Sequence, residues 1–176
     1  RPDHWIKNLT ILPGILLAWT ICRPQDIGNS IGSIVVALLS TFLIASSNYT
    51  INELLDANED KNHPDRCFRP VPAGRIIPFW GYTQWFLLAL GGLTLAWFEN
   101  KAFFLTAFLF FVMGIIYNVK PIRTKDLVYL DVLTESLNIP IRFLLGWYAI
   151  KCYSIPPVSL MMALWMLAAF FMSIKR

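Results

Sequence analysis

Cysteine is scarce in this sequence, and its spacing matches no known binding pattern. The 176 residues include three cysteines, Cys22, Cys67 and Cys152, which lie far apart in the chain. An odd number without metal-ligand spacing excludes a zinc module and a small disulfide scaffold. We therefore expect the three cysteines to serve packing and to form no disulfide framework.

Charged residues are also scarce, and long stretches of the sequence contain no charged residue. Charged residues make up 15% of the chain against 56% hydrophobic residues, and the mean hydropathy is +0.54. Long apolar stretches between short polar connections exclude an ordinary soluble domain. The basic residues form no tract interleaved with exposed aromatic residues, so we expect no nucleic-acid partner.

The apolar stretches predict an all-α, polytopic membrane helical bundle. Six candidate spans lie near residues 9–22, 31–51, 79–98, 102–117, 128–150 and 156–174. Connections on the cytoplasmic side of a membrane retain Lys and Arg. One side of this topology holds eleven basic residues and the other three, Arg23, Lys101 and Lys151. This sorting predicts that the polar segment from Asn52 to Arg75 lies on the cytoplasmic side.

That polar segment begins with a regular array of oxygen-bearing side chains. Asn52, Asp56 and Asp60 are spaced i, i+4 and i+8, so on a helix they drift by only about 40° per step and share one face. Carboxylate and amide oxygens suit Mg²⁺, whose coordination is often completed by substrate phosphates. We predict that these three residues bind Mg²⁺ and are catalytic. The alternative is a solvated charged connection between two membrane helices.

Basic residues on the same side of the membrane are candidates for binding phosphate, because guanidinium pairs bidentately with it and lysine supplies a point charge. Two of them follow the acidic array, two lie in the connection between the fourth and fifth spans, and one precedes the first span. Tyr117, at the start of that connection, could also bind phosphate. The predicted substrate-binding residues are Lys7, Arg66, Arg69, Tyr117, Lys120 and Arg123. Positive-inside topology and interfacial anchoring are the alternative explanations of these residues.

The fifth span contains polar residues at membrane depth. Asp131, Glu135, Asn138 and Arg142 stand at offsets of 0, 4, 7 and 11, which keeps them on one stripe of a helix. Ionisable residues within a membrane are expensive and usually functional. We predict that Asp131 binds substrate, orienting the acceptor or a second metal. A buried Glu135–Arg142 ion pair that holds helices together is the alternative.

The acidic array resembles the N-D-x-x-D-x-x-x-D signature of UbiA-type intramembrane prenyltransferases, with Glu53 in place of the first Asp. Further motifs make the chain similar to the branch of this superfamily that contains decaprenyl-phosphate phosphoribosyltransferase. They are Arg1-Pro2-x-x-Trp5-x-Lys7-Asn8, His63-Pro64, Arg69-Pro70, Ala73-Gly74 and the final Lys175-Arg176.

The resemblance implies an all-helical bundle of about nine membrane helices, since helices satisfy their own backbone hydrogen bonds in lipid. It also implies two acidic motifs that hold Mg²⁺ and a substrate diphosphate on the cytoplasmic side. We expect residues 1–176 to be one UbiA-like transmembrane domain, cut at both ends and inactive alone, with the second acidic motif beyond Arg176. The membrane implied is a prokaryotic plasma membrane.

The resemblance favours transfer of a phosphoribosyl group from phosphoribosyl pyrophosphate to a polyprenyl phosphate, in contact with membrane lipid. The second hypothesis is transfer of a polyprenyl group from an isoprenoid diphosphate to an aromatic or other polar acceptor. The residues alone do not separate these two, because both donors present a metal-bound diphosphate. A transporter is a third reading, but no matching pair of broken helices recurs in two halves of the sequence.

Overall fold

The computed structural model describes residues 8–152 and 154–174, and this part of the chain contains helices and loops but no strand. The helices are α1 (Leu12–Cys22), α2 (Ile27–Asp60), α3 (Pro78–Glu99), α4 (Lys101–Asn118), α5 (Leu130–Ser136), α6 (Asn138–Ala149) and α7 (Val158–Ile174), with a short 3-10 helix, η2 (Thr124–Asp126). The predicted all-α class is confirmed.

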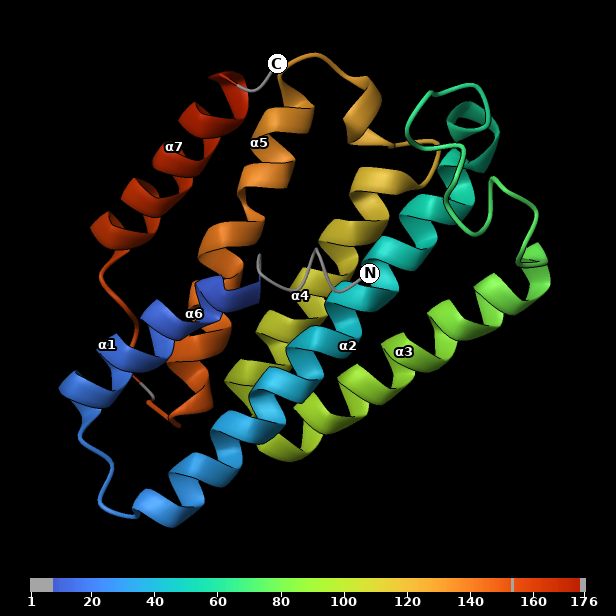
Figure 1. The fold of residues 1–176 in the computed structure, drawn as a ribbon. Coiled ribbons are helices and arrows are strands. Elements are labelled where there is room, and N and C mark those ends of the chain that lie inside the picture. The colour runs from blue at the N-terminus through green and yellow to red at the C-terminus, as the bar shows by residue number, and fades with distance from the viewer. Residues whose placement is uncertain (1–7, 153, 175–176) are drawn as a thin grey trace.

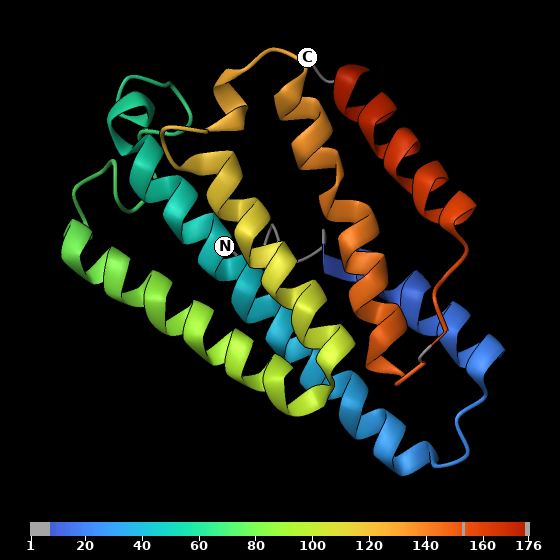
Figure 2. The same cartoon turned by 180° about the vertical axis from the view of Figure 1, so that it is seen from behind.

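The long helix α2 runs diagonally through the bundle, and the other helices are arranged around it (Figures 1 and 2). Its closest neighbour is α3, and α4 and α6 also pack against it. α1 packs on α6, whereas α7 packs on α5 and α6. The chain from 61 to 77 and the connection between α4 and α5 lie together at one end of the bundle (Figure 1).

Local sequence explains several helix starts. The side chain of Asp26 accepts a hydrogen bond from the backbone N–H of Asn29 at the start of α2. Asn100 caps α4 in the same way through the N–H of Phe103. α1 and α3 each have proline in the first turn, where its missing N–H costs nothing.

The fifth predicted span, 128–150, is two helices rather than one. α5 ends at Ser136 and α6 begins at Asn138, with Leu137 between them. Pro140 has no N–H to donate to the carbonyl of Ser136, so the helical ladder is interrupted there. The indole N–H of Trp165 on α7 donates to Leu133 O at 3.2 Å and to Ser136 Oγ at 3.0 Å. These two hydrogen bonds from α7 therefore stabilise the end of α5 where the helix is interrupted.

Large apolar side chains cover the outer faces of the bundle. Phe98 on α3 is 80% exposed, and Phe170 and Phe171 on α7 are 60% and 62% exposed. Such extensive apolar exposure suits lipid rather than water. By length and composition, α2 and α4 can each cross a membrane.

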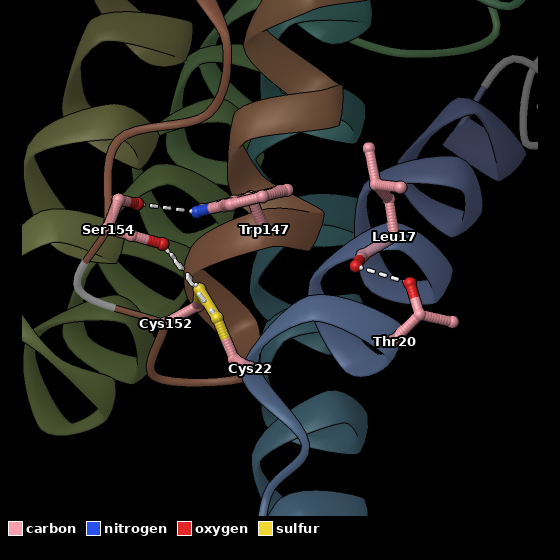
Figure 3. The surroundings of a disulfide bond; sticks show 6 residues. All are labelled: Leu17, Thr20, Cys22, Trp147, Cys152 and Ser154. Carbon is pink, nitrogen blue, oxygen red and sulfur yellow. Dashed lines mark hydrogen bonds between the residues drawn. A yellow bond between two sulfur atoms is a disulfide. The ribbon is translucent and has the colours of Figure 1, made fainter.

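α1 and α6 are joined more closely than the sequence suggested. A Cβ on Gly14 would meet the carbonyl of Phe143, and a Cβ on Gly146 would meet the carbonyl of Ile11, so the two backbones touch. Beyond this contact, Cys22 and Cys152 form a disulfide, with their Cα atoms 5.8 Å apart (Figure 3). The expectation of cysteines without a disulfide was wrong, because 130 residues of sequence separation hide the shared end of α1 and α6.

Candidate active site

Two buried carboxylates lie in the last two turns of α2. Asp56 is 9% exposed and Asp60 is 2% exposed. As predicted, the helix of the second span continues without a break through the acidic segment. The C-terminal end of a helix has a partial negative charge, and the last turn of α2 contains no basic residue. These carboxylates therefore need cations from elsewhere in the chain.

Asp60 receives its cations from the loop that follows α2. Arg69 donates to Asp60 Oδ2, and the Nη1 atom of Arg66 lies 3.6 Å from Asp60 Oδ1. The side chain of Arg69 is 21% exposed, whereas that of Arg66 is 51% exposed. Arg69 therefore forms the more buried ion pair with Asp60, whereas Arg66 lies at the solvent boundary.

Asp56 receives its cations from the connection between α4 and α5. Arg123 Nη2 lies 3.3 Å from Asp56 Oδ1, and the ammonium of Lys125 donates to the same oxygen. Arg123 also donates to Glu59 at 2.9 Å and lies 2.9 Å from Asp126 Oδ2. Segments far apart in the sequence are therefore tied together over the end of α2.

The arrangement concentrates ionic groups of both signs in one small region. Buried carboxylates are costly unless they are paired, and four cations supply that pairing here. The same guanidinium and ammonium groups are suited to phosphate oxygens. The region can therefore bind a polyanion together with a divalent cation.

Asn52 and Glu53 face different surroundings. Asn52 lines a cavity inside the bundle, whereas Glu53 lines a separate pocket between α2 and α3. Glu53 Oε1 accepts a hydrogen bond from the N–H of Val71 at 3.2 Å, which fixes the loop after α2. The acid at this position thus contacts the loop rather than the face shared by Asp56 and Asp60.

The cavity that Asn52 lines has a volume of about 280 Å³. Polar side chains from α2, α4, α5 and α6 meet in it, including Asn52, Tyr117, Glu135 and Arg142. The hydroxyl of Tyr117 donates to Glu135 Oε2 at 3.3 Å. Apolar side chains complete the lining, namely Ala45, Phe110, Ile139 and Met172.

The structure brings together most, but not all, of the residues selected from sequence. Arg66, Arg69 and Arg123 contact the carboxylates, and Tyr117 lines the cavity. Lys120 is exposed, and Asp131 is buried but does not line the cavity. Lys7 lies outside the described residues.

Three of the four residues of the polar stripe predicted in the fifth span lie together in the structure. Glu135, Asn138 and Arg142 line the same cavity across the break between α5 and α6, but Asp131 does not. Glu135 is held by Tyr117, and Arg142 by Asn8, so the structure records no direct ion pair between Glu135 and Arg142.

Lys125 is the residue that sequence reasoning missed. Its side chain is 12% exposed and contacts Asp56. The available signal was its position two residues after Arg123 in a basic connection, but nothing in the pattern distinguished it from Lys120.

Comparison with known families gives a clear match. The family model described as the UbiA prenyltransferase family matches residues 8–175. The chain belongs to the UbiA prenyltransferase family. UbiA proteins are integral membrane transferases, which agrees with the apolar outer faces of the bundle.

Two curated UbiA relatives have the same name. Decaprenyl-phosphate phosphoribosyltransferase of Mycolicibacterium smegmatis is 34% identical over 153 residues, which is 85% of this chain and 46% of that protein. The protein of that name from Mycobacterium tuberculosis is 30% identical over 118 residues, 66% of this chain and 39% of that protein. The chain thus spans about half the length of its curated relatives or less.

Solved UbiA structures have the same fold. A UbiA homologue from Archaeoglobus fulgidus bound to DMAPP and Mg²⁺ aligns with a TM-score of 0.81 at 24% identity. The alignment covers 97% of this chain and 59% of that chain. The same homologue bound to GPP and Mg²⁺ aligns with a TM-score of 0.81 at 23% identity.

The donor set of this UbiA chain fits a hard divalent cation. Asp56 and Asp60 offer carboxylate oxygens on one helix, and Mg²⁺ prefers such ligands. Among the described residues, no group of three acidic, His or Cys side chains is arranged to hold a metal alone. A metal bound here would need oxygens from water and a substrate, as Mg²⁺ usually does.

Proposed function

We propose that the protein is a Mg²⁺-dependent membrane transferase that moves a phosphoribosyl group from phosphoribosyl pyrophosphate to a polyprenyl phosphate. The observation behind this proposal is the buried pair Asp56 and Asp60, which are paired with cations and follow Asn52, a residue of the central cavity, on the same helix. Such a site suits a diphosphate leaving group. Because the chain spans about half of its relatives, the activity is proposed for the whole protein.

In this reaction, a phosphate oxygen of the lipid bonds to C1 of the ribose while the C1–O bond to diphosphate breaks. The electron pair of that bond leaves with the diphosphate, and no oxidant or co-reactant is needed. Mg²⁺, when bound, neutralises charge that develops on the leaving group. Arg69 and Arg123 donate charge-assisted hydrogen bonds to the oxygens of the leaving diphosphate. Such bonds are strongest in a site that excludes water.

Asn52, Asp56 and Asp60 are the residues we assign to the metal and the diphosphate, with Asn52 the member that faces the cavity. Arg66, Arg69, Arg123 and Lys125 are assigned to the phosphates, because they already bind the carboxylates that a metal would take over. Lys7, Lys120 and Asp131 remain predictions from sequence.

The choice of donor rests on the relatives. Two proteins named decaprenyl-phosphate phosphoribosyltransferase are 34% and 30% identical to this chain. The second candidate is prenyl transfer from a polyprenyl diphosphate, since the Archaeoglobus homologue of the same fold was solved with DMAPP and with GPP.

The experiment uses the full-length protein in detergent with Mg²⁺. One reaction contains labelled phosphoribosyl pyrophosphate and polyprenyl phosphate, and the other contains labelled polyprenyl diphosphate and aromatic acceptors. We expect label to enter lipid in the first reaction only. Product in the second reaction alone would replace the donor we propose by a prenyl diphosphate.

We further propose that the active site faces the cytoplasm of a prokaryotic cell. The cations around Asp56 and Asp60 lie at one end of the bundle, whereas the Cys22–Cys152 disulfide lies at the other (Figures 1 and 3). Disulfides persist in oxidising compartments, and Lys and Arg are retained in the cytoplasm.

This orientation predicts how the cysteines react in intact cells. Cys67 is free and partly exposed in the loop after α2, and the other two cysteines are joined. A membrane-impermeant maleimide should label Cys67 only after the membrane is permeabilised, and Cys22 and Cys152 only after reduction. A Cys67→Ser variant is the control for background. Labelling of Cys67 in intact cells would place the site on the outside.

A further inference from the structure

The proposed reaction leaves one buried arginine of the bundle without a role. Arg142 is 7% exposed, stands one turn into α6 and lines the central cavity. Among the described residues that line this cavity, it is the only one with a positive charge. A cation buried inside a membrane bundle is expensive, so its presence points to a ligand or a partner of opposite charge.

The neighbours of Arg142 orient its guanidinium without neutralising it by direct contact. Its Nε donates to Asn8 Oδ1 at 3.1 Å, and Nη1 lies 3.4 Å from the carbonyl of Asn138. Its Cζ atom lies 4.9 Å from the centre of the Phe110 ring. Tyr49 and Glu135 also act on its charge. The carboxylate of Glu135, which also lines the cavity, accepts a hydrogen bond from Tyr117.

An unpaired donor lies beside this guanidinium. Asn8 is 1% exposed, and its Nδ2 has no hydrogen-bond partner among the described residues, although its Oδ1 accepts from Arg142. A buried donor without a partner costs roughly 1–3 kcal/mol. Arg142 and Asn8 together therefore offer positive charge and a spare N–H, which is a combination that suits an anion.

The distance to the carboxylates fits two substrates bound end to end. Tyr49, which contacts Arg142, lies seven residues before Asp56 on α2, or about 10 Å along the helix axis. A ribose between a leaving diphosphate and an attacking phosphate can bridge such a gap.

We infer that Arg142, with Asn8, binds the phosphate monoester of the lipid acceptor inside the cavity. This inference rests on the proposed function, in which that phosphate is the nucleophile. Arg142 holds one of its oxygens while another attacks C1, and the apolar lining receives the start of the isoprenoid tail. An acceptor without a negative charge would leave Arg142 unpaired, so this arginine also selects the acceptor class.

The test measures binding of farnesyl phosphate and of farnesol to the full-length protein, with EDTA present to remove divalent metal. Wild-type protein should bind farnesyl phosphate at least tenfold more tightly than farnesol. Arg142→Gln should lose that preference and keep its affinity for farnesol, which reports that the cavity is intact. Glu135→Gln should bind farnesyl phosphate as well as wild type or better, because a negative charge is removed from the cavity.

A second variant covers the case in which Arg142→Gln does not fold. Asn8→Asp keeps the oxygen that accepts from Arg142 but adds a charge that repels phosphate, so it should weaken farnesyl phosphate binding at least tenfold. An unchanged preference for farnesyl phosphate in Arg142→Gln, or in Asn8→Asp, would overturn the inference and leave the diphosphate site untouched. The variants could lose the preference for farnesyl phosphate while the wild-type protein transfers no phosphoribosyl group. That result would support the anion site and overturn the proposed donor.

Discussion

Asp60→Asn is expected to lower turnover of the full-length protein by at least about a hundredfold. Asparagine keeps the shape and an oxygen that can accept from Arg69, but it removes the charge that a metal needs. Asp56→Asn should have an effect of the same size, because Asp56 is the other buried carboxylate on the same helix. The measurement is kcat with labelled phosphoribosyl pyrophosphate and polyprenyl phosphate at saturating Mg²⁺.

Asp65→Asn is the matched control for this prediction. Asp65 lies in the loop directly after α2, is exposed, and undergoes the same chemical change. It should retain turnover within about threefold of wild type, since surface substitutions rarely matter. Thermal unfolding of each variant without metal separates loss of chemistry from loss of fold. Turnover within threefold of wild type in both Asp56→Asn and Asp60→Asn would contradict the metal role.

Sequence predicted the fold well because its signals were local. Apolar length and the sorting of basic residues depend on neighbouring positions, and they predicted six spans. Five of these correspond to single helices of the described chain, whereas the fifth is divided into α5 and α6. The continuation of α2 into the acidic segment was also predicted, because no proline or glycine separates Ala45 from Asp60. The motif that marks the family lies on that same helix.

Where sequence failed, the deciding contact joined distant segments. The Cys22–Cys152 disulfide depends on α1 and α6 ending side by side, which three isolated cysteines do not reveal. The division of the fifth span has a local cause in part, since Pro140 has no N–H to donate to the carbonyl of Ser136. What sequence did not reveal was Trp165 on α7, whose indole supports the break from another helix.

The candidate site shows the same limit. Asp56 and Asp60 could be predicted from spacing within one helix, but their partners come from the loop after α2 and from the connection after α4. Charge counting identified the correct connections and could not rank the residues within them. Lys120 and Lys125 look equivalent in sequence, yet one is exposed and the other contacts a buried carboxylate.

Lys125→Met is therefore expected to lower kcat by on the order of a hundredfold, which is the usual cost of losing one donor to developing negative charge. The ammonium of Lys125 donates to Asp56, one of the two carboxylates that we assign to the metal. If Asp56 bound a metal, the flexible stem of Lys125 would let its charge move to the diphosphate of the substrate. Methionine keeps much of the apolar stem and removes the charge.

Lys125→Met should also lower the Mg²⁺ concentration that half-saturates the protein. Without Lys125, Arg123 is the one cation of the described residues that still pairs with Asp56, so half-saturation of the protein by Mg²⁺ with diphosphate should need less metal. Binding can be followed by the metal-dependent shift of thermal unfolding, independently of turnover. Lys61→Met is the control, because Lys61 is an exposed lysine at the end of α2. A purely structural Lys125 would give a less stable protein with unchanged metal demand, whereas a lysine that alternates between Asp56 and the diphosphate gives a lower kcat together with a lower metal demand.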